Sequence, residues 1–137
     1  MKYEKSCGAV VYTKINNEVK FVLVRQLKGF YGFPKGHVED GETEKQTAIR
    51  EVKEETNVNV QILSDKKYQT NYIIKDKNID KDVIFFLAKP LNLNQKPQLE
   101  EVIRSEWKKF EDALEVITYE RSRELLKEAI KDYKEMI

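Results

Sequence analysis

The run from Gly36 to Val58 constrains this chain more than any other part of its sequence. It reads GHVEDGETEKQTAIREVKEETNV and brings Glu51, Glu54 and Glu55 together in a segment whose apolar residues have helical spacing. Residues three and four apart share a face of a helix, so the three carboxylates are expected to point the same way. Like charges three or four residues apart destabilise a helix by about 0.2–0.5 kcal/mol per pair. Carboxylates kept this close are typical of a cation site, and hard divalent cations such as Mg²⁺ prefer oxygen ligands. The run therefore predicts a metal-dependent enzyme.

Composition limits the other classes of protein to which the chain could belong. Charged residues make up 36% of its 137 residues, and the formal net charge is +1. This balance argues against a protein that holds extended nucleic acid mainly through charge, although a nucleotide or an RNA 5′ end would still suit it as a ligand. No apolar run approaches the roughly 20 residues that span a bilayer, and the N-terminal residues lack the apolar core of a signal peptide. We expect one soluble domain over residues 1–137, with no membrane partner.

The single cysteine, Cys7, excludes an internal disulfide and favours a reducing, cytoplasmic compartment. It lies in the apolar run Cys7–Tyr12 and is predicted to be a small buried side chain. The alternative, a thiol nucleophile, has no neighbouring group in the sequence that would activate it.

Short apolar or alternating runs predict the strands of a sheet. They are Gly8–Tyr12, Phe21–Arg25, Val58–Leu63, Lys67–Ile74 and Val83–Lys89. Asn16 and Asn17 form a plausible hairpin turn between the first two strands, and the charged stretch Lys75–Lys81 predicts a second turn. The lysines of this region are Lys66, Lys67, Lys75, Lys77 and Lys81. They are predicted to be ordinary solvated side chains, because aspartates alternate with several of them, and the alternative is that they help to attract a polyanion.

Helical spacing predicts two helices, Thr43–Thr56 and Tyr119–Ile137, with a short helical turn at Glu111–Val116. Thr43 followed by Gln46 is a capping box that begins the first helix. Strands mixed with two helices in a chain of this length predict the α/β class, with a sheet covered on both faces.

The charged face of the first helix has two interpretations. Glu/Lys-rich helices commonly present a solvated charged face, and the sequence EVKEE by itself fits that interpretation. The alternative is a metal site, in which Arg50 holds one carboxylate in a fixed orientation as a hydrogen-bond donor. The fixed spacing back to Glu42 and Gly36 favours the metal site.

This spacing resembles the Nudix box, Gly-x5-Glu-x7-Arg-Glu-U-x-Glu-Glu-x-Gly-U, in which U is a bulky aliphatic residue. The matching residues are Gly36, Glu42, Arg50, Glu51, Val52, Glu54, Glu55 and Val58. Asn57 stands where the pattern has glycine, and asparagine tolerates the left-handed conformation that can end a helix. The resemblance implies the Nudix α/β/α sandwich, with a mixed sheet between helices, and hydrolysis of a nucleoside diphosphate linked to another group.

The resemblance also implies roles for individual residues. It makes Glu51, Glu54 and Glu55 ligands of Mg²⁺, for which Mn²⁺ could substitute, together with the Gly36 carbonyl. It implies a further glutamate before Trp107, for which Glu101 has the favoured spacing, and it leaves open which glutamate activates the attacking water. Glu42 would tie the loop to the helix. The catalytic set is thus predicted as Glu54, Glu51, Arg50 and Glu101.

The flanks of the box are most similar to the asymmetrical diadenosine tetraphosphate hydrolases of this family. The run Pro34-Lys35-Gly36-His37 carries the similarity, together with FFLAKP and the segments around Trp107 and Tyr119. It implies that Lys35 and His37 face the polyphosphate. Stacking of a nucleobase needs an aromatic ring, and Tyr31, Tyr72 and Tyr119 are the candidates. For Tyr72 and Tyr119, packing within the fold is an equal alternative, and for Tyr68 packing is favoured.

Three functional hypotheses follow. The first is asymmetrical cleavage of diadenosine tetraphosphate into ATP and AMP with magnesium. The second is another Nudix substrate, such as oxidised dGTP, a triphosphorylated RNA 5′ end or an inositol pyrophosphate. The third is a non-catalytic nucleotide sensor, against which the complete set of box glutamates argues.

Overall fold

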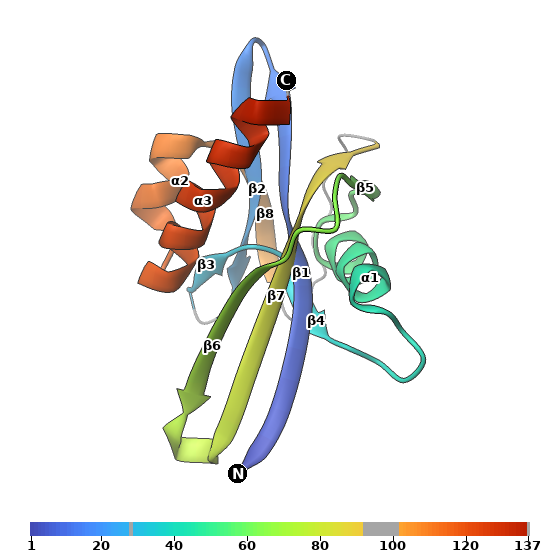
Figure 1. Ribbon diagram of the computed structural model, residues 1–137. Coiled ribbons are helices and arrows are strands. Elements are labelled where there is room, and N and C mark those ends of the chain that lie inside the picture. The colour runs from blue at the N-terminus through green and yellow to red at the C-terminus, as the bar shows by residue number, and fades with distance from the viewer. Residues whose placement is uncertain (28, 92–101, 137) are drawn as a thin grey trace.

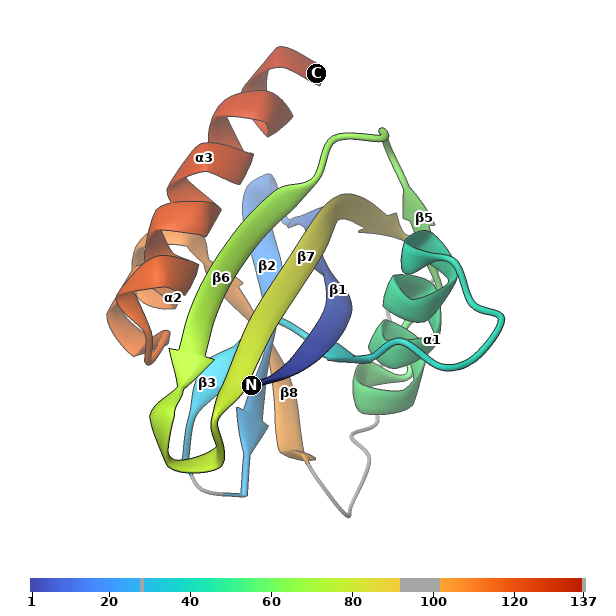
Figure 2. The same cartoon turned by 60° about the horizontal axis from the view of Figure 1, so that its bottom comes forward.

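The computed structural model describes residues 1–27, 29–91 and 102–136, and within these ranges the chain forms an eight-stranded sheet with helices on both faces (Figure 1). Helix α1 (Glu44–Thr56) covers one face. Helices α2 (Phe110–Val116) and α3 (Glu120–Met136) lie together on the other face, as the turned view in Figure 2 also shows. The predicted α/β class and the α/β/α sandwich are confirmed.

The sheet is mixed, as predicted, because one of its pairings is parallel. Its strands are β1 (Lys2–Ile15), β2 (Glu18–Gln26), β3 (Tyr31–Gly32), β4 (Lys35–His37), β5 (Val60–Ile62), β6 (Tyr68–Ile74), β7 (Ile79–Pro90) and β8 (Val102–Lys109). Strand β1 runs parallel to β7, and the remaining pairs are antiparallel. The sequence did not predict β3, β4 or β8, since the first two are very short and the third is rich in charged residues.

Two predicted turns lie close to where the sequence placed them. Asn16 and Asn17 both have positive φ, 52° and 67°, and join β1 to β2 as a tight hairpin. The second turn is a 3₁₀ turn at Lys75–Lys77 that ends at Asn78, which has φ 54°. It is shorter than predicted, because β7 begins at Ile79.

The sheet separates two apolar cores. The core under α2 and α3 contains Leu125, Leu126, Ala129 and Tyr133 of α3, and Tyr68 lies fully buried in it, as predicted. On the opposite face α1 buries Val52 and Ala48, and Cys7 packs with Ala48. Cys7 is fully buried, as predicted, and burial raises the pKa of its thiol to about 11. Among the described residues, no helix has both the length and the apolar character needed to cross a membrane.

Local sequence determines both ends of α1. Thr43 accepts a hydrogen bond from the Gln46 backbone N–H at 3.1 Å, and the Gln46 side chain accepts one from the Thr43 backbone N–H at 2.8 Å. This is the predicted capping box. At the other end Asn57 adopts the left-handed conformation, with φ 61°, and its N–H donates to the Lys53 carbonyl at 2.9 Å. The asparagine therefore replaces the glycine of the Nudix pattern without losing the helix end.

Strand β4 lies so close to β1 that only glycine fits at Gly8. A Cβ at Gly8 would lie 2.0 Å from the Pro34 carbonyl oxygen and 2.7 Å from the Lys35 Cβ. We expect Gly8→Ala to lower the free energy of unfolding by about 1–3 kcal/mol, because the two strands would have to separate. Urea denaturation would measure the loss, with Gly32→Ala as the control, since an added Cβ at Gly32 meets nothing within 4 Å. Equal stability of the two variants would contradict this packing.

Candidate active site

Strand β4 holds the Lys35-Gly36-His37 segment against the first part of β1, with Gly36 opposite Cys7. From there the backbone of Gly36 faces the Glu51 side chain of α1. A Cβ at Gly36 would lie 1.7 Å from Glu51 Oε2, so the carboxylate occupies the space that any other side chain would need. A larger residue at position 36 would therefore displace the Glu51 carboxylate from the position in which Arg50 holds it.

The carboxylates of α1 do not all point the same way. Glu51 and Glu55, one helical turn apart, are buried, with exposed fractions of 8% and 2%, and both line the same cavity. Glu54 is exposed and does not line the cavity. The predicted common direction is thus wrong for Glu54, because a residue directly before Glu55 is rotated about 100° around the helix axis.

Arg50 connects these carboxylates to the loop that precedes the helix. Its Nη1 donates to Glu51 Oε1 at 2.7 Å and to Glu54 Oε1 at 3.3 Å. Its Nε and Nη2 donate to the two oxygens of Glu42 at 2.6 and 2.9 Å, and Nη2 also donates to the His37 carbonyl at 3.0 Å. The bidentate pair confirms that Glu42 ties the loop to the helix. The hydrogen bond from Arg50 thereby fixes the orientation of the Glu51 carboxylate.

Burial changes the acidity of the two carboxyls that face the cavity. Desolvation raises the pKa of Glu55 to about 8, although the backbone N–H of Lys35 donates to its Oε1 at 2.9 Å and opposes the shift. Desolvation also raises the pKa of Glu51, while the hydrogen bond from Arg50 lowers it. Buried carboxyl groups that lack a full complement of cationic partners are suited to an additional positive charge.

The α1 side chains suit a divalent cation by their donor chemistry. Within the described ranges, no three His, Cys, Asp or Glu side chains converge as a preformed metal site. Glu55 forms no ion pair with a described residue, and Glu51 lies directly over the Gly36 backbone. Carboxylate and carbonyl oxygens are the ligands that Mg²⁺ and Mn²⁺ take. Glu101, the further glutamate predicted from the sequence, lies outside the described residues.

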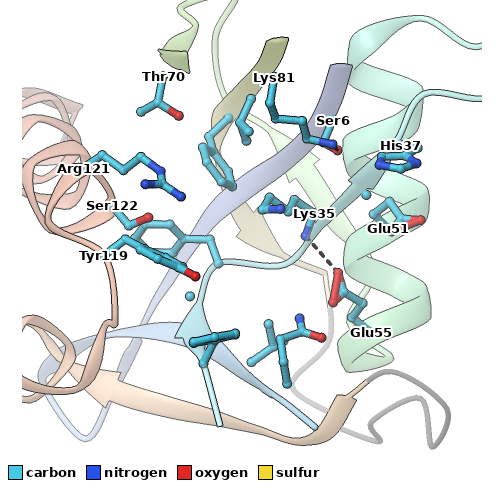
Figure 3. Close-up of a pocket in the computed structure, with 18 of the residues that line it drawn as sticks. Ser6, Lys35, His37, Glu51, Glu55, Thr70, Lys81, Tyr119, Arg121 and Ser122 are labelled. Carbon is cyan, nitrogen blue, oxygen red and sulfur yellow. Dashed lines mark hydrogen bonds between the residues drawn. The ribbon is translucent and has the colours of Figure 1, made fainter. Parts of the chain in front are cut away.

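The carboxylates form one wall of a cavity of about 670 Å³. Figure 3 shows Glu51 and Glu55 on α1 at one side, Lys35 in the middle, and Tyr119, Arg121 and Ser122 of the α3 region opposite. The predicted residues that line the cavity are Tyr31, Lys35, Gly36, His37, Glu51, Glu55, Tyr72 and Tyr119. The structure thus brings most of the predicted site residues together from segments distant in sequence.

Two lysines supply positive charge inside the cavity. Lys35 is exposed in terms of its accessible surface area, but it lines the cavity. Desolvation by the surrounding cavity residues lowers the pKa of its ammonium group. Lys81 is buried, donates from Nζ to Ser6 Oγ at 2.7 Å, and also has a pKa lowered by burial. The prediction that Lys81 is an ordinary solvated lysine is therefore wrong. Its Nζ and His37 Nε2 each lie 3.6 Å from Glu4 Oε1.

Aromatic rings form the wall remote from α1. Tyr72 on β6 and Tyr119 before α3 both line the cavity, and the Tyr119 ring centroid lies 5.7 Å from that of Phe30. Tyr31 positions this wall, because its backbone N–H donates to Thr118 Oγ1 at 2.8 Å and its carbonyl accepts from the Thr118 N–H at 3.1 Å. Its hydroxyl donates to Glu106 Oε1 at 3.2 Å.

Sequence reasoning missed Lys81, Phe30 and Arg121 as cavity residues. A signal for Lys81 was present, since Ile79, Lys81 and Val83 alternate on one face of β7 and all three are buried. Arg121 carried no signal, because it reaches the cavity only through the docking of α3 beside β6.

The ion pair of Glu42 predicts a dependence of stability on pH. The hydrogen bonds from Arg50 lower the pKa of Glu42 from 4.5 to about 2. Because the pKa in the folded state is depressed, the stabilisation is complete above pH 4.5 and is lost as the pH falls toward 2. We expect Glu42→Gln to reduce the free energy of unfolding at pH 7 and the difference from the wild type to shrink between pH 4.5 and 3. Urea unfolding at several pH values would measure it, and a constant difference would contradict the assignment.

The fold and the site define a class of enzyme. The NUDIX domain family model matches residues 5–129, and the chain belongs to that family. It is a Nudix hydrolase, an enzyme of the pyrophosphohydrolase type.

Individual relatives show which members of the Nudix family this chain resembles. The bis(5′-nucleosyl)-tetraphosphatase [asymmetrical] of Caenorhabditis elegans is 32% identical over 126 residues, which cover 90% of this chain and 91% of the relative. That of Mus musculus is 26% identical with the same coverage. The crystal structure of a C. elegans Ap4A hydrolase binary complex matches with a TM-score of 0.84 and 31% identity, covering 98% of this chain and 99% of the other.

Proposed function

We propose that this chain hydrolyses dinucleoside polyphosphates and cleaves diadenosine tetraphosphate asymmetrically into ATP and AMP. The observation that carries the proposal is the order of groups across one cavity: carboxylates on α1, lysines in the middle, and tyrosine rings on the remote wall. A ligand with a nucleobase and a long phosphate chain matches this order. The similarity to asymmetrical tetraphosphatases over nine-tenths of the chain supports it.

The proposed roles of the α1 side chains follow from their chemistry. Glu51, Glu54, Glu55, the Gly36 carbonyl and Glu101 would hold Mg²⁺, or Mn²⁺ in its place. Glu54 does not line the cavity, but the Arg50 Nη1 that donates to Glu51 also donates to Glu54 at 3.3 Å, so the two carboxylates lie beside each other. A bound divalent cation neutralises phosphate charge and lowers the pKa of water. Arg50 keeps Glu51 in position through its hydrogen bond, and one of the glutamates accepts the proton of the attacking water.

The remaining cavity residues would bind the substrate. Lys35 and His37 contact the polyphosphate, and Lys81 adds a second ammonium group to the same cavity. Tyr72 and Tyr119 offer their rings to a nucleobase, with Tyr31 holding the Tyr119 segment in place. We also propose that residues 1–137 act as one domain in the cytoplasm, which fits the single buried thiol of Cys7.

Product analysis by ion-exchange chromatography tests the proposal. Purified protein with magnesium would receive diadenosine tetraphosphate, nucleoside triphosphates including oxidised dGTP, and triphosphorylated RNA in parallel. We expect release of ATP plus AMP from the first and little turnover of the others. Turnover restricted to triphosphates or to RNA would overturn the substrate assignment while keeping the hydrolase class. Binding without turnover of any of them would indicate a nucleotide sensor.

A further inference from the structure

Arg121, in the first turn of α3, covers the two tyrosine rings of the cavity. Its guanidinium carbon lies 3.7 Å from the ring centroid of Tyr72 and 4.2 Å from that of Tyr119. Figure 3 shows the side chain pointing from α3 into the cavity, toward the wall formed by Lys35 and Lys81. A planar guanidinium at these distances occupies the faces on which a flat nucleobase would stack.

The guanidinium of Arg121 is held by the two rings rather than by an ion pair. It forms no hydrogen bond or ion pair with any residue that the structure describes. Arg123 differs, because it pairs with Glu120 at 2.6 Å and donates to the Ile117 carbonyl at 2.5 Å. Arg121 adds its positive charge to those of Lys35 and Lys81, which line the same cavity. A planar fork of unused N–H donors in such a cavity is suited to phosphate oxygens.

We propose that Arg121 is a specificity-determining residue that exchanges partners when substrate binds: its guanidinium leaves the rings of Tyr72 and Tyr119 to the nucleobase and contacts the polyphosphate chain. This inference rests on the proposed function and names a further residue for it. The exchange keeps both tyrosine faces covered by a planar group in each state. It also makes occupation of the rings depend on the presence of a phosphate chain that can accept Arg121.

The exchange predicts that loss of Arg121 changes the affinity for a phosphate chain and the affinity for a nucleoside in opposite directions. Without Arg121 the cavity loses a group that donates hydrogen bonds to phosphate oxygens. Arg121→Gln should therefore weaken binding of tripolyphosphate about tenfold. The rings are then already uncovered, so the same variant should bind adenosine, which has no phosphate, about twofold to threefold more tightly. A substitution that merely displaced α3 would weaken both ligands.

Isothermal titration calorimetry in EDTA would measure both affinities without metal or turnover. Wild type, Arg121→Gln and Arg121→Lys would each be titrated with tripolyphosphate and with adenosine. The matched control is Lys131→Gln, which removes one positive charge from an exposed position of α3 outside the cavity. Thermal unfolding would check that each variant keeps the fold. We expect Arg121→Lys to retain part of the tripolyphosphate affinity, because it keeps the charge without the planar fork.

Steady-state kinetics separate this inference from the proposed function. With diadenosine tetraphosphate, Arg121→Gln should raise KM about tenfold and leave kcat near the wild-type value. If the wild type cleaves this substrate and Arg121→Gln leaves both affinities and KM unchanged, the role of Arg121 is overturned and the proposed function stands. Opposite shifts in the two affinities, with no cleavage by the wild type, would overturn the substrate assignment and support Arg121 as a phosphate ligand. Parallel weakening of both ligands, or no binding of either by the wild type, would overturn the exchange.

Discussion

Glu54→Gln is expected to lower kcat by about 10³-fold and to leave the fold intact. Glutamine keeps the length and shape of the side chain and can still accept the hydrogen bond that Arg50 donates at 3.3 Å. Glutamine lacks the negative charge with which glutamate binds a divalent cation or accepts a proton from water. An exposed ion pair of this kind contributes about 0–1 kcal/mol to stability, so activity and stability should separate.

The matched control for this variant is Glu115→Gln, because Glu115 is also exposed but lies on α2, on the face of the sheet opposite α1. Activity would be measured by release of ATP and AMP over a range of magnesium concentrations, and stability by urea denaturation. The control should retain wild-type rates. If Glu54→Gln hydrolysed the substrate as fast as the wild type, the assignment of Glu54 to the metal and proton chemistry would be wrong.

Features that depend on local sequence could be predicted well. The capping box of Thr43, the helix end at Asn57 and the hairpin turn at Asn16 each involve residues a few positions apart, and each is confirmed. The grouping of box residues with Tyr72 and Tyr119 in one cavity was predicted through family resemblance rather than through local pattern.

Features that depend on the docking of distant segments could not be predicted. Half of the residues of strand β8 are charged, and the segment forms a strand because β2 supplies its hydrogen-bonding partner. Lys81 belongs to a segment whose charged composition is typical of a solvated turn. In the structure it lies inside β7, and the residues two positions before and after it are buried on the same face. The outward direction of Glu54 depends on which face α1 turns to the sheet, and periodicity alone did not separate it from Glu51 and Glu55.

The approach of α1 to β4 at Gly36 leads to the second large effect. Gly36→Ala places a Cβ 1.7 Å from Glu51 Oε2, so either the carboxylate or the backbone of β4 must move. A displacement of about 1 Å in a catalytic group can cost about 10² in rate, and we expect a loss of that order in kcat/KM. The loss should come with a decrease of about 1–3 kcal/mol in the free energy of unfolding, since the contact is overpacked.

A double-mutant cycle with Glu51→Asp identifies the source of this loss. Aspartate is one methylene shorter and withdraws the carboxylate from the space above residue 36, so the double variant should regain stability relative to Gly36→Ala alone. It should not regain activity, because the shortened carboxylate no longer reaches the position in which Arg50 holds Glu51 Oε1, at 2.7 Å. Gly32→Ala, which meets nothing within 4 Å, serves as the control for an added methyl group. Additive stability effects in the cycle would show that the 36–51 contact does not constrain the site, and the glycine of the motif would then need another explanation.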